Sequence, residues 1–276
     1  MTRNTMEDDL FHFRSKKNLL ITAFLFLCTA AHASTVLLSN VPDYAWTLGC
    51  SPTSATMLMA YYDLNGFDSQ SYTNLIAGGT PVLNTFTASS AVVSSAIATM
   101  AADMGTNASG GSVGYFYNNG TPFTAQDSIN NGIDTGIVYG LWAYVNAAGY
   151  SDAATNFFDQ LVYSVSAPYG YTFADYEASI NAGIPVLIEL SGHTMLGYGY
   201  NSDDDLIYVH DTWSSGGGTM TWDGAYGGMQ MVGVTAAEME GGSSATPEPA
   251  SLLLLGSGLA SLIGFARLEV KPRKGR

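Results

Sequence analysis

All nine lysines and arginines of this 276-residue chain lie in its two terminal segments. Residues 34–245 contain eighteen aspartates and glutamates but no lysine or arginine. A carboxylate in this stretch can form a salt bridge only with a histidine, so stability must come from buried apolar surface and from hydrogen bonds. About 210 residues are enough for one domain with a sizeable core.

The acidity of residues 34–245 also restricts the partners of this domain. Nucleic acid is excluded, because binding to phosphate depends on lysine and arginine. A cationic peptide or a polycation would be attracted instead. The same charge also serves simply to keep a secreted protein soluble.

The N-terminal segment has the order of a secretory signal. Basic residues precede the apolar residues 19–31, and Ala31-His32-Ala33 offers the small-x-small pattern that a signal peptidase accepts. The apolar run is short for a membrane span. Residues 1–33 are therefore predicted to be a signal peptide, which makes the rest of the chain an exported protein.

The C-terminal segment predicts a membrane anchor. Residues 250–266 hold no charged side chain. As a helix, at about 1.5 Å per residue, they would span roughly 25 Å, slightly less than a hydrocarbon core of ~30 Å. Five basic residues follow, and such a cluster prefers the cytoplasmic side. Together with an N-terminal signal, this places the domain outside the cell membrane.

Residues 246–276 as a whole resemble the PEP-CTERM sorting signal of Gram-negative bacteria. Pro247-Glu248-Pro249, an apolar span and a basic end occur in that order. The resemblance implies processing by an exosortase-type enzyme, contact with the membrane through the tail, and extracellular polysaccharide as a further partner. The expected location is the cell envelope or cell surface, or the medium once the tail is removed. A plain single-span anchor would also give a surface protein.

Cysteine and histidine are scarce in the predicted domain. The chain has two cysteines, and Cys28 lies in the predicted signal, so Cys50 remains alone and can form no intramolecular disulfide. His193 and His210 are the histidines of residues 34–245. A closed zinc site is implausible with so few ligands, and neither metal nor cofactor is expected. The lone thiol is a candidate nucleophile.

The residues around Cys50 predict the start of a helix. Gly49 permits a tight approach of the chain, Pro52 suits a first helical turn, and Asn65-Gly66 supplies a stop. At a helix N-terminus, the macrodipole and free N–H groups favour the thiolate. The alternative is a small buried cysteine packed at the start of a helix.

A second region predicts a helix over residues 173–181, then strands over 184–190, 193–200 and 206–210. The last two strands form a hairpin around an acidic turn. His193 at its start and Asp211 at its end can lie side by side across the ladder, where a carboxylate can orient an imidazole. The alternative for His193 is a strand-end histidine that is hydrogen-bonded to the backbone, and the alternative for Asp211 is an ordinary turn residue.

Two further features compete with this arrangement. His210 is the rival base, although on an extended strand it points to the face opposite Asp211. The run Asp203-Asp204-Asp205 could attract Ca²⁺, whose usual ligands are carboxylates. Three adjacent residues of a strand turn cannot all converge on one ion, so a solvated turn is predicted.

The quoted pieces resemble papain-fold cysteine peptidases of the peptidase C39-like type. The resemblance implies an α+β fold, in which an N-terminal helix carrying the cysteine packs on an antiparallel sheet carrying histidine and aspartate. Residues 80–167 match no part of the pattern. The matching pieces are Gly49-Cys50-Ser51-Pro52-Thr53-Ser54, Gly183-Ile184-Pro185-Val186, Gly192-His193-Thr194 and Asp211-Thr212-Trp213.

The chemistry implied by the resemblance is acyl transfer by a thiolate on a peptide or protein substrate. Cys50 would attack a carbonyl, His193 would take the thiol proton and later protonate the leaving amine, and Asp211 would hold the imidazole. Papain relatives also carry a glutamine several residues before the cysteine, which stabilises the oxyanion. Here Tyr44 and Trp46 stand in that region, so they are the candidate donors beside the Cys50 N–H group.

The missing glutamine leaves several functions open. Loss of one oxyanion donor typically costs about 10²–10³ in rate, so the domain is a weak peptidase, another acyl-transfer enzyme or an inactive relative. The alternative function is a non-catalytic surface or matrix protein that keeps the papain-like fold for binding. Gly241-Gly242 before the tail also allows self-release, because some C39 relatives cleave after double glycine.

Overall fold

The computed structural model describes residues 35–106, 113–164 and 166–240. The predicted signal peptide, sorting tail and Gly241-Gly242 linker lie outside these residues. Within the described part of the chain, no helix is both long enough and apolar enough to span a membrane.

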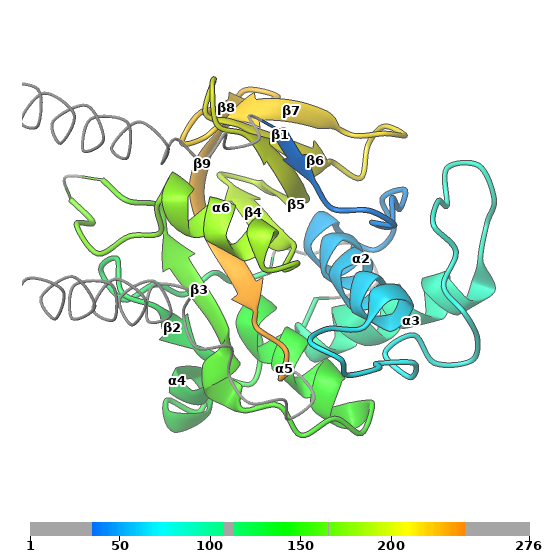
Figure 1. The fold of residues 1–276 in the computed structure, drawn as a ribbon. Coiled ribbons are helices and arrows are strands. Elements are labelled where there is room, and N and C mark those ends of the chain that lie inside the picture. Colours follow the sequence, from blue (N-terminus) through cyan, green and yellow to red (C-terminus); the bar gives the residue numbers. More distant parts are fainter. Residues whose placement is uncertain (1–34, 107–112, 165, 241–276) are drawn as a thin grey trace, which may run out of the picture.

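One half of the domain is helical (Figure 1). Its helices begin at side-chain caps where the sequence offers them: the Ser90 hydroxyl accepts from the Val93 N–H group, and Thr124 and Asp127 form a reciprocal capping box. The helices of this half are α2 (Cys50–Asn65), α3 (Ala91–Asp103), α4 (Ala125–Asn130) and α5 (Ile137–Ala147).

The other half is an antiparallel sheet with the order β2-β3-β9-β4-β5-β6-β7, in which β1 pairs with β5 and β8 pairs with β9. The helix α6 (Phe173–Asn181) packs on this sheet. The strands are β1 (Thr35–Leu37), β2 (Phe123–Thr124), β3 (Phe157–Leu161), β4 (Val186–Leu190), β5 (His193–Asn201), β6 (Leu206–His210), β7 (Gly218–Thr221), β8 (Ala225–Tyr226) and β9 (Met229–Ala237). A short 3₁₀ turn (Ala154–Asn156) precedes β3.

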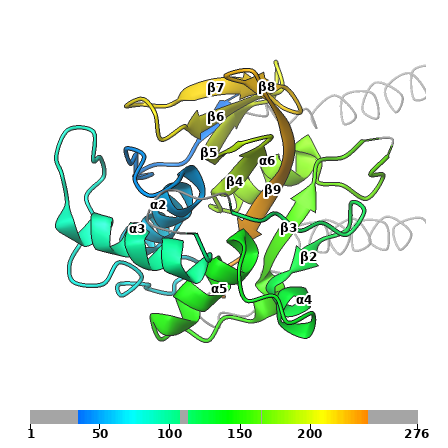
Figure 2. The same ribbon diagram turned by 180° about the vertical axis from the view of Figure 1, so that it is seen from behind.

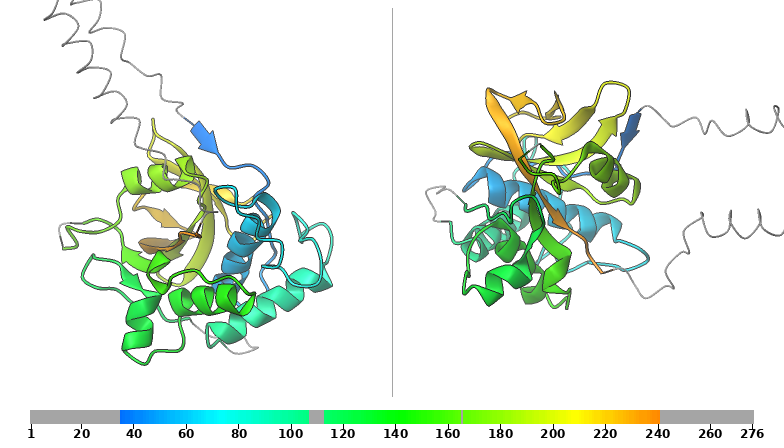
Figure 3. Two further views of the ribbon diagram at one scale, coloured as in Figure 1. Left: turned by 60° about the horizontal axis from the view of Figure 1, so that its bottom comes forward. Right: turned by 90° about the vertical axis from the view of Figure 1, so that its left-hand side faces the viewer.

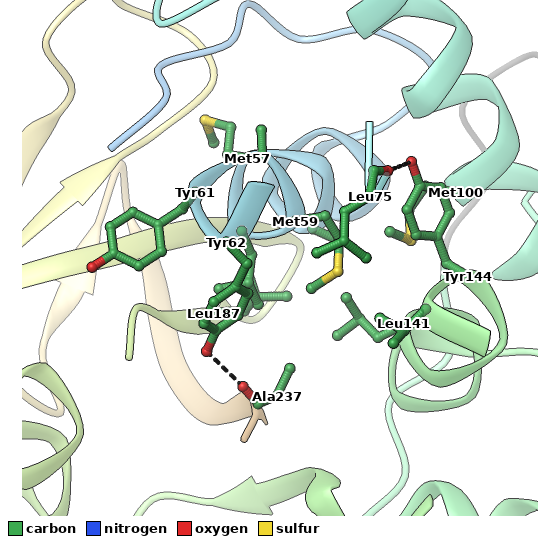
Figure 4. Close-up of a cluster of buried hydrophobic side chains, with 14 of the residues drawn as sticks. Met57, Met59, Tyr61, Tyr62, Leu75, Met100, Leu141, Tyr144, Leu187 and Ala237 are labelled. Atoms are coloured by element: carbon green, nitrogen blue, oxygen red, sulfur yellow. Dashed lines mark hydrogen bonds between the residues drawn. The ribbon is translucent and has the colours of Figure 1, made fainter. Parts of the chain in front are cut away.

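Helix α2 lies at the centre of the molecule, between α3 and the strands β4 and β5 (Figure 2). Residues 51–62 are all buried, so α2 has no solvent-facing stripe, as expected for a helix surrounded by protein. Figure 4 shows the core around it, where the Tyr62 hydroxyl donates to the Ala237 carbonyl at 2.8 Å. The Tyr144 hydroxyl donates to the Leu75 carbonyl at 2.6 Å in the same way.

Strand β9 belongs to both halves. Met231 and Val234 lie in the core between the sheet and α6, whereas Ala237 at the end of the strand lies in the core around α2. The strand runs the length of the sheet from one half into the other (Figure 3). Strand β9 therefore contributes to both cores and ties the two halves together.

The structure confirms the predicted α+β class and the elements read around the candidate residues. Helix α2 starts at Cys50 and ends before Gly66, α6 covers the predicted residues 173–181, and β5 and β6 form the predicted hairpin. The unmatched residues 80–167 supply α3, α4, α5, β2 and β3. Their described part therefore completes the helical half and one edge of the sheet.

Candidate active site

A strained turn delivers Cys50 to the first position of α2. Leu48 and Gly49 both have positive φ angles, 56° and 134°, and a Cβ atom on Gly49 would approach the Pro52 ring to 3.1 Å. Glycine is therefore required at this position. The Thr53 hydroxyl fixes the turn by donating toward the Gly49 carbonyl at 2.7 Å, and it accepts from the Thr47 N–H group.

Cys50 opens into a cavity of about 300 Å³ between the two halves. The thiol is half-buried, as suits a group that must be desolvated yet reachable. The cavity walls come from the turn before α2, the β4–β5 turn and two connecting segments. Its lining residues are Trp46, Gly49, Cys50, Ser51, Pro52, Val113, Tyr115, Gly192, His193 and Trp213.

His193 faces Cys50 across this cavity with a defined tautomer. Its Nε2 atom lies 2.8 Å from the main-chain carbonyl oxygen of Asp211. A carbonyl can only accept, so Nε2 carries the hydrogen, and a neutral ring then leaves Nδ1 free of a proton. Nδ1 can therefore take the proton of the Cys50 thiol. Trp213 stacks on the imidazole with ring centroids 3.8 Å apart, which leaves His193 only 2% exposed.

The contact predicted between the Asp211 carboxylate and the imidazole is wrong in detail. Asp211 does lie beside His193, but it holds the ring through its main-chain carbonyl. Its carboxylate instead accepts from the N–H groups of Trp213 and Ser214, and from the hydroxyls of Ser214 and Tyr226. Burial would raise the Asp211 pKa, but the Tyr226 hydroxyl and the other three donors outweigh it and lower that pKa. The side chain thus fixes the turn that aims the carbonyl.

The surroundings of Cys50 favour its ionised form. Burial raises the pKa of the thiol, but hydrogen bonding and charge attraction from His193 act against burial. Smaller contributions come from the Thr194 backbone and the Ser51 side chain, and the balance lowers the pKa below its ordinary value. A thiolate beside an imidazolium is the reactive form of cysteine nucleophiles.

The two predicted oxyanion donors lie in different surroundings. Tyr44 is fully buried, and its hydroxyl donates to the Val82 carbonyl at 2.9 Å, so it is a core residue away from the cavity. Its prediction as an oxyanion donor is therefore wrong. Trp46 is 49% exposed and lines the cavity beside Cys50. The backbone N–H group of Cys50, in the first turn of α2, is one of those that a helix leaves without an intrahelical partner.

A trio of hydroxyl groups at the base of the cavity was not foreseen from the sequence. Thr194 follows His193 on β5, and its Oγ1 atom lies 2.8 Å from Ser51 Oγ and 2.5 Å from Tyr115 Oη. Ser54 on α2 donates to the Thr194 carbonyl at 3.0 Å. Tyr115 lies between α3 and β2, in a stretch rich in glycine, asparagine and serine whose composition carries no signal for such a role.

A pair of buried carboxyl groups lies behind this trio. Glu189 on β4 and Asp159 on β3 are both fully buried, and the Thr235 hydroxyl on β9 lies within hydrogen-bond distance of both. The Tyr117 hydroxyl donates to Glu189 at 2.9 Å, and the Tyr117 ring stacks on that of Tyr115. Burial raises the pKa of Asp159 to about 7 and raises that of Glu189 well above its ordinary range.

The remaining candidates lie elsewhere. His210 Nδ1 is 2.8 Å from the Pro42 carbonyl, its ring packs on Tyr198, and it does not line the cavity. Asp203-Asp204-Asp205 form the exposed turn between β5 and β6. Among residues 35–240 that the structure describes, no group of three or more His, Cys, Asp or Glu side chains could hold a metal ion.

Comparison with models of known protein families identifies a match over most of the domain. The model of the "Peptidase_C39 like family" matches residues 38–230, which include every described residue of the cavity and both strands of the hairpin. Neither a curated protein nor a solved structure matches the chain.

Proposed function

The chain belongs to the peptidase C39-like family, and from this we propose that it is an exported hydrolase that cleaves peptide or related acyl bonds with Cys50 as its nucleophile. The family makes it a cysteine peptidase-like protein with the papain-like α+β fold. The observation that carries the catalytic proposal is the pairing of Cys50 with His193 at the wall of the cavity.

The reaction follows from the tautomer of His193. Nδ1 takes the thiol proton, and the Cys50 thiolate attacks the substrate carbonyl carbon to form a tetrahedral oxyanion. Collapse breaks the C–N bond as the imidazolium returns its proton to the leaving amine, and a thioester remains. A water molecule, deprotonated by His193, then attacks the thioester and releases the acid and the free thiol. Asp211 acts through its main-chain carbonyl, which keeps Nε2 protonated throughout.

Stabilisation of the oxyanion falls to two donors in this proposal. The Cys50 N–H group is one, and the indole N–H group of Trp46, a residue that lines the cavity, is the other. Trp46→Phe keeps an aromatic ring but removes the donor, so kcat should fall by about 10²-fold with little change in KM. Trp142→Phe, at a half-buried position of α5 that does not line the cavity, serves as the matched control. An unchanged kcat in Trp46→Phe would assign the second donor elsewhere.

The direct test compares wild-type full-length chain with Cys50→Ala and His193→Ala against a mixed peptide library, with products read by mass spectrometry. We expect wild-type cleavage and a loss of at least about 10³-fold in both variants. His210→Ala removes the other histidine of the domain and should retain cleavage. Turnover that persists in Cys50→Ala would refute the proposal. Such turnover would not come from this site. If Cys50→Ala also retained binding to cells or polysaccharide, the non-catalytic surface-binding alternative would be favoured.

Export and surface sorting complete the proposal. They are supported by the N-terminal signal pattern and by the Pro247-Glu248-Pro249 tail with its basic end. The partners proposed on that basis are an exosortase-type enzyme, the membrane through the tail and extracellular polysaccharide. Cell fractionation of the wild-type protein and of a chain truncated after residue 245 would test this. Release of the truncated protein into the medium, with the wild type in the envelope, is the expected result.

A further inference from the structure

Three hydroxyl groups from three separate elements meet beneath Cys50. Ser51 belongs to α2, Thr194 to β5, and Tyr115 to the connection between α3 and β2. Thr194 is fully buried and Ser51 is 4% exposed, whereas Tyr115 is half-buried and reaches the cavity. Polar groups removed from water to this extent must satisfy one another, because an unpaired hydroxyl would cost free energy.

Counting hydrogens gives this trio a direction. Thr194 Oγ1 contacts both neighbours, at 2.8 Å from Ser51 and 2.5 Å from Tyr115, yet it has one hydrogen to donate. A thiolate has none and can only accept. The Ser51 side chain is also a hydrogen-bond partner of Cys50. With its hydroxyl turned toward the sulfur, both remaining contacts are satisfied only if Tyr115 donates to Thr194 and Thr194 donates to Ser51.

The phenol is suited to the far end of such a chain. Tyr115 is the most acidic of the three hydroxyls and therefore the strongest donor. Burial and the neighbouring Glu189 raise the pKa of Tyr115, so it keeps its proton at every pH at which Cys50 ionises. Each hydrogen bond of a chain with one direction polarises the next, which concentrates the effect on the terminal acceptor.

We propose that Tyr115, Thr194 and Ser51 form a directed hydroxyl relay that ends on the Cys50 sulfur and stabilises it as the thiolate. Tyr115 is the positioning residue at its far end and contacts no reacting atom. The inference rests on the proposed function only in that it concerns the same sulfur. Its effect is on the thiol itself and can be measured without a substrate.

Other ionisable groups near Cys50 must be separated from this effect. His193 faces the sulfur from β5, and Glu189 lies on β4 as the cross-strand neighbour of Thr194. The Asp211 carboxylate faces Ser214 and Tyr226. Tyr115→Phe changes none of these charges and keeps the aromatic ring, so it isolates the hydroxyl.

The experiment measures the pH midpoint of Cys50 alkylation by iodoacetamide in the full-length chain, with the modified site mapped by peptide mass spectrometry. Only the thiolate reacts, so the midpoint reports its formation. Tyr115→Phe should raise the midpoint by about 0.5–1 pH unit, as expected for the loss of one net hydrogen bond. The matched control is Tyr117→Phe, because the Tyr117 hydroxyl donates to Glu189 and not to the trio. This variant should leave the midpoint unchanged.

A double variant tests whether the hydroxyls act in series. Ser51→Ala removes the last link, so it should raise the midpoint at least as much as Tyr115→Phe. Adding Tyr115→Phe to Ser51→Ala should then change nothing further, because the relay is already cut. Additive shifts, a wild-type midpoint in Ser51→Ala, or equal shifts in Tyr115→Phe and Tyr117→Phe would each overturn the relay.

The outcome is independent of peptidase activity. If the variants show the predicted midpoint shifts but the wild-type chain cleaves no peptide, the proposed function is refuted and the relay stands. If the wild-type chain cleaves peptides through Cys50 but all variants share its alkylation midpoint, the relay is refuted and the proposed function stands. If Tyr115→Phe fails to fold, as judged by circular dichroism, Ser51→Ala and Thr194→Val provide the same readout, and an unmoved midpoint in both would refute the relay.

Discussion

Asp211 and the Glu189–Asp159 pair are two solutions to one problem, which is how to place a carboxyl group inside a domain without lysine or arginine. Asp211 accepts from four N–H and O–H donors, and those donors keep it ionised. Glu189 and Asp159 share the one hydroxyl hydrogen of Thr235, which can satisfy a single oxygen. The second contact with Thr235 therefore requires a proton on one of the two carboxyl groups.

The comparison shows that a sufficient set of hydrogen-bond donors can outweigh burial in setting the charge of a carboxyl group here. Asp211 is itself only 3% exposed, yet its pKa is lowered. The donors to the pair behind Tyr115 are the hydroxyls of Thr235 and Tyr117 and the Phe116 N–H group at 3.4 Å. Burial outweighs them, and the pKa values of both carboxyl groups are raised. Ionised and neutral carboxyl groups thus coexist in one domain without a cation.

Asp211→Ala should have the largest effect, because it leaves four donors without their acceptor. We expect a loss of about 3 kcal/mol in the free energy of unfolding, measured by urea denaturation. Peptide cleavage should fall as well, because the turn that presents the 211 carbonyl to His193 loosens. Asp204→Ala, in the exposed turn between β5 and β6, is the control and should unfold like wild type. Equal free energies of unfolding for the two variants would show that the hydrogen bonds to the Asp211 carboxylate do not stabilise the fold.

The buried pair should give stability a pH dependence of the opposite sign from that of Asp211. Its folded pKa values are raised, to about 7 for Asp159 and well above the ordinary range for Glu189. The stabilising contribution of Asp159 is therefore complete below the unfolded value near 4 and is lost as pH rises through about 7, whereas that of Glu189 persists to higher pH. Between pH 5 and 7, the free energy of unfolding should fall by about 1 kcal/mol per pH unit for one proton. Asp211, with a lowered pKa, loses its contribution only as pH falls below about 4.

Glu189→Gln sharpens the same measurement, because an amide copies the protonated acid without a proton to lose. The slope between pH 5 and 7 should become clearly shallower, and above pH 7 the variant should be at least as stable as wild type. Asp204→Asn changes an exposed carboxyl and should keep the wild-type slope. A Glu189→Gln slope as steep as that of wild type would mean that the pair is not the source.

Tyr226→Phe should have the smallest effect, since it removes one of the four donors to Asp211. A loss of about 1 kcal/mol in the free energy of unfolding is expected, together with a rise in the Asp211 pKa followed by NMR titration. Tyr163→Phe, at a side chain that is 53% exposed, controls for loss of a phenol. If Tyr226→Phe left the Asp211 pKa in place, the main-chain donors alone would account for the ionised state.

The sequence predicted those parts of the site that are written in local patterns. Gly49, Pro52 and the Asn65-Gly66 stop define α2, and two strand-forming runs joined by a tight acidic turn define β5 and β6. These signals need only neighbours along the chain. They placed Cys50, His193 and Asp211 at the ends of elements, where the structure has them.

The rest depended on side-chain direction and on contacts between distant segments. Tyr44 and Trp46 are two residues apart, and only the packed structure decides that Tyr44 points into the core and Trp46 toward the cavity. The backbone conformation at residues 211–214 decides whether the carboxylate or the carbonyl of Asp211 contacts His193. Tyr115 is 79 residues from Thr194 in sequence, in a stretch without periodicity.

The placement of β9 has a mechanical consequence. Residues 233–237 pair with β3 on one side, and residues 231–235 pair with β4 on the other, both antiparallel. The hydrogen bonds of these ladders lie perpendicular to the strand. A pull on the chain beyond Glu240, directed along β9, would therefore load both ladders at once in shear, and they would have to break together. A domain held by its C-terminal end is thus fastened through a central strand that is paired on both sides.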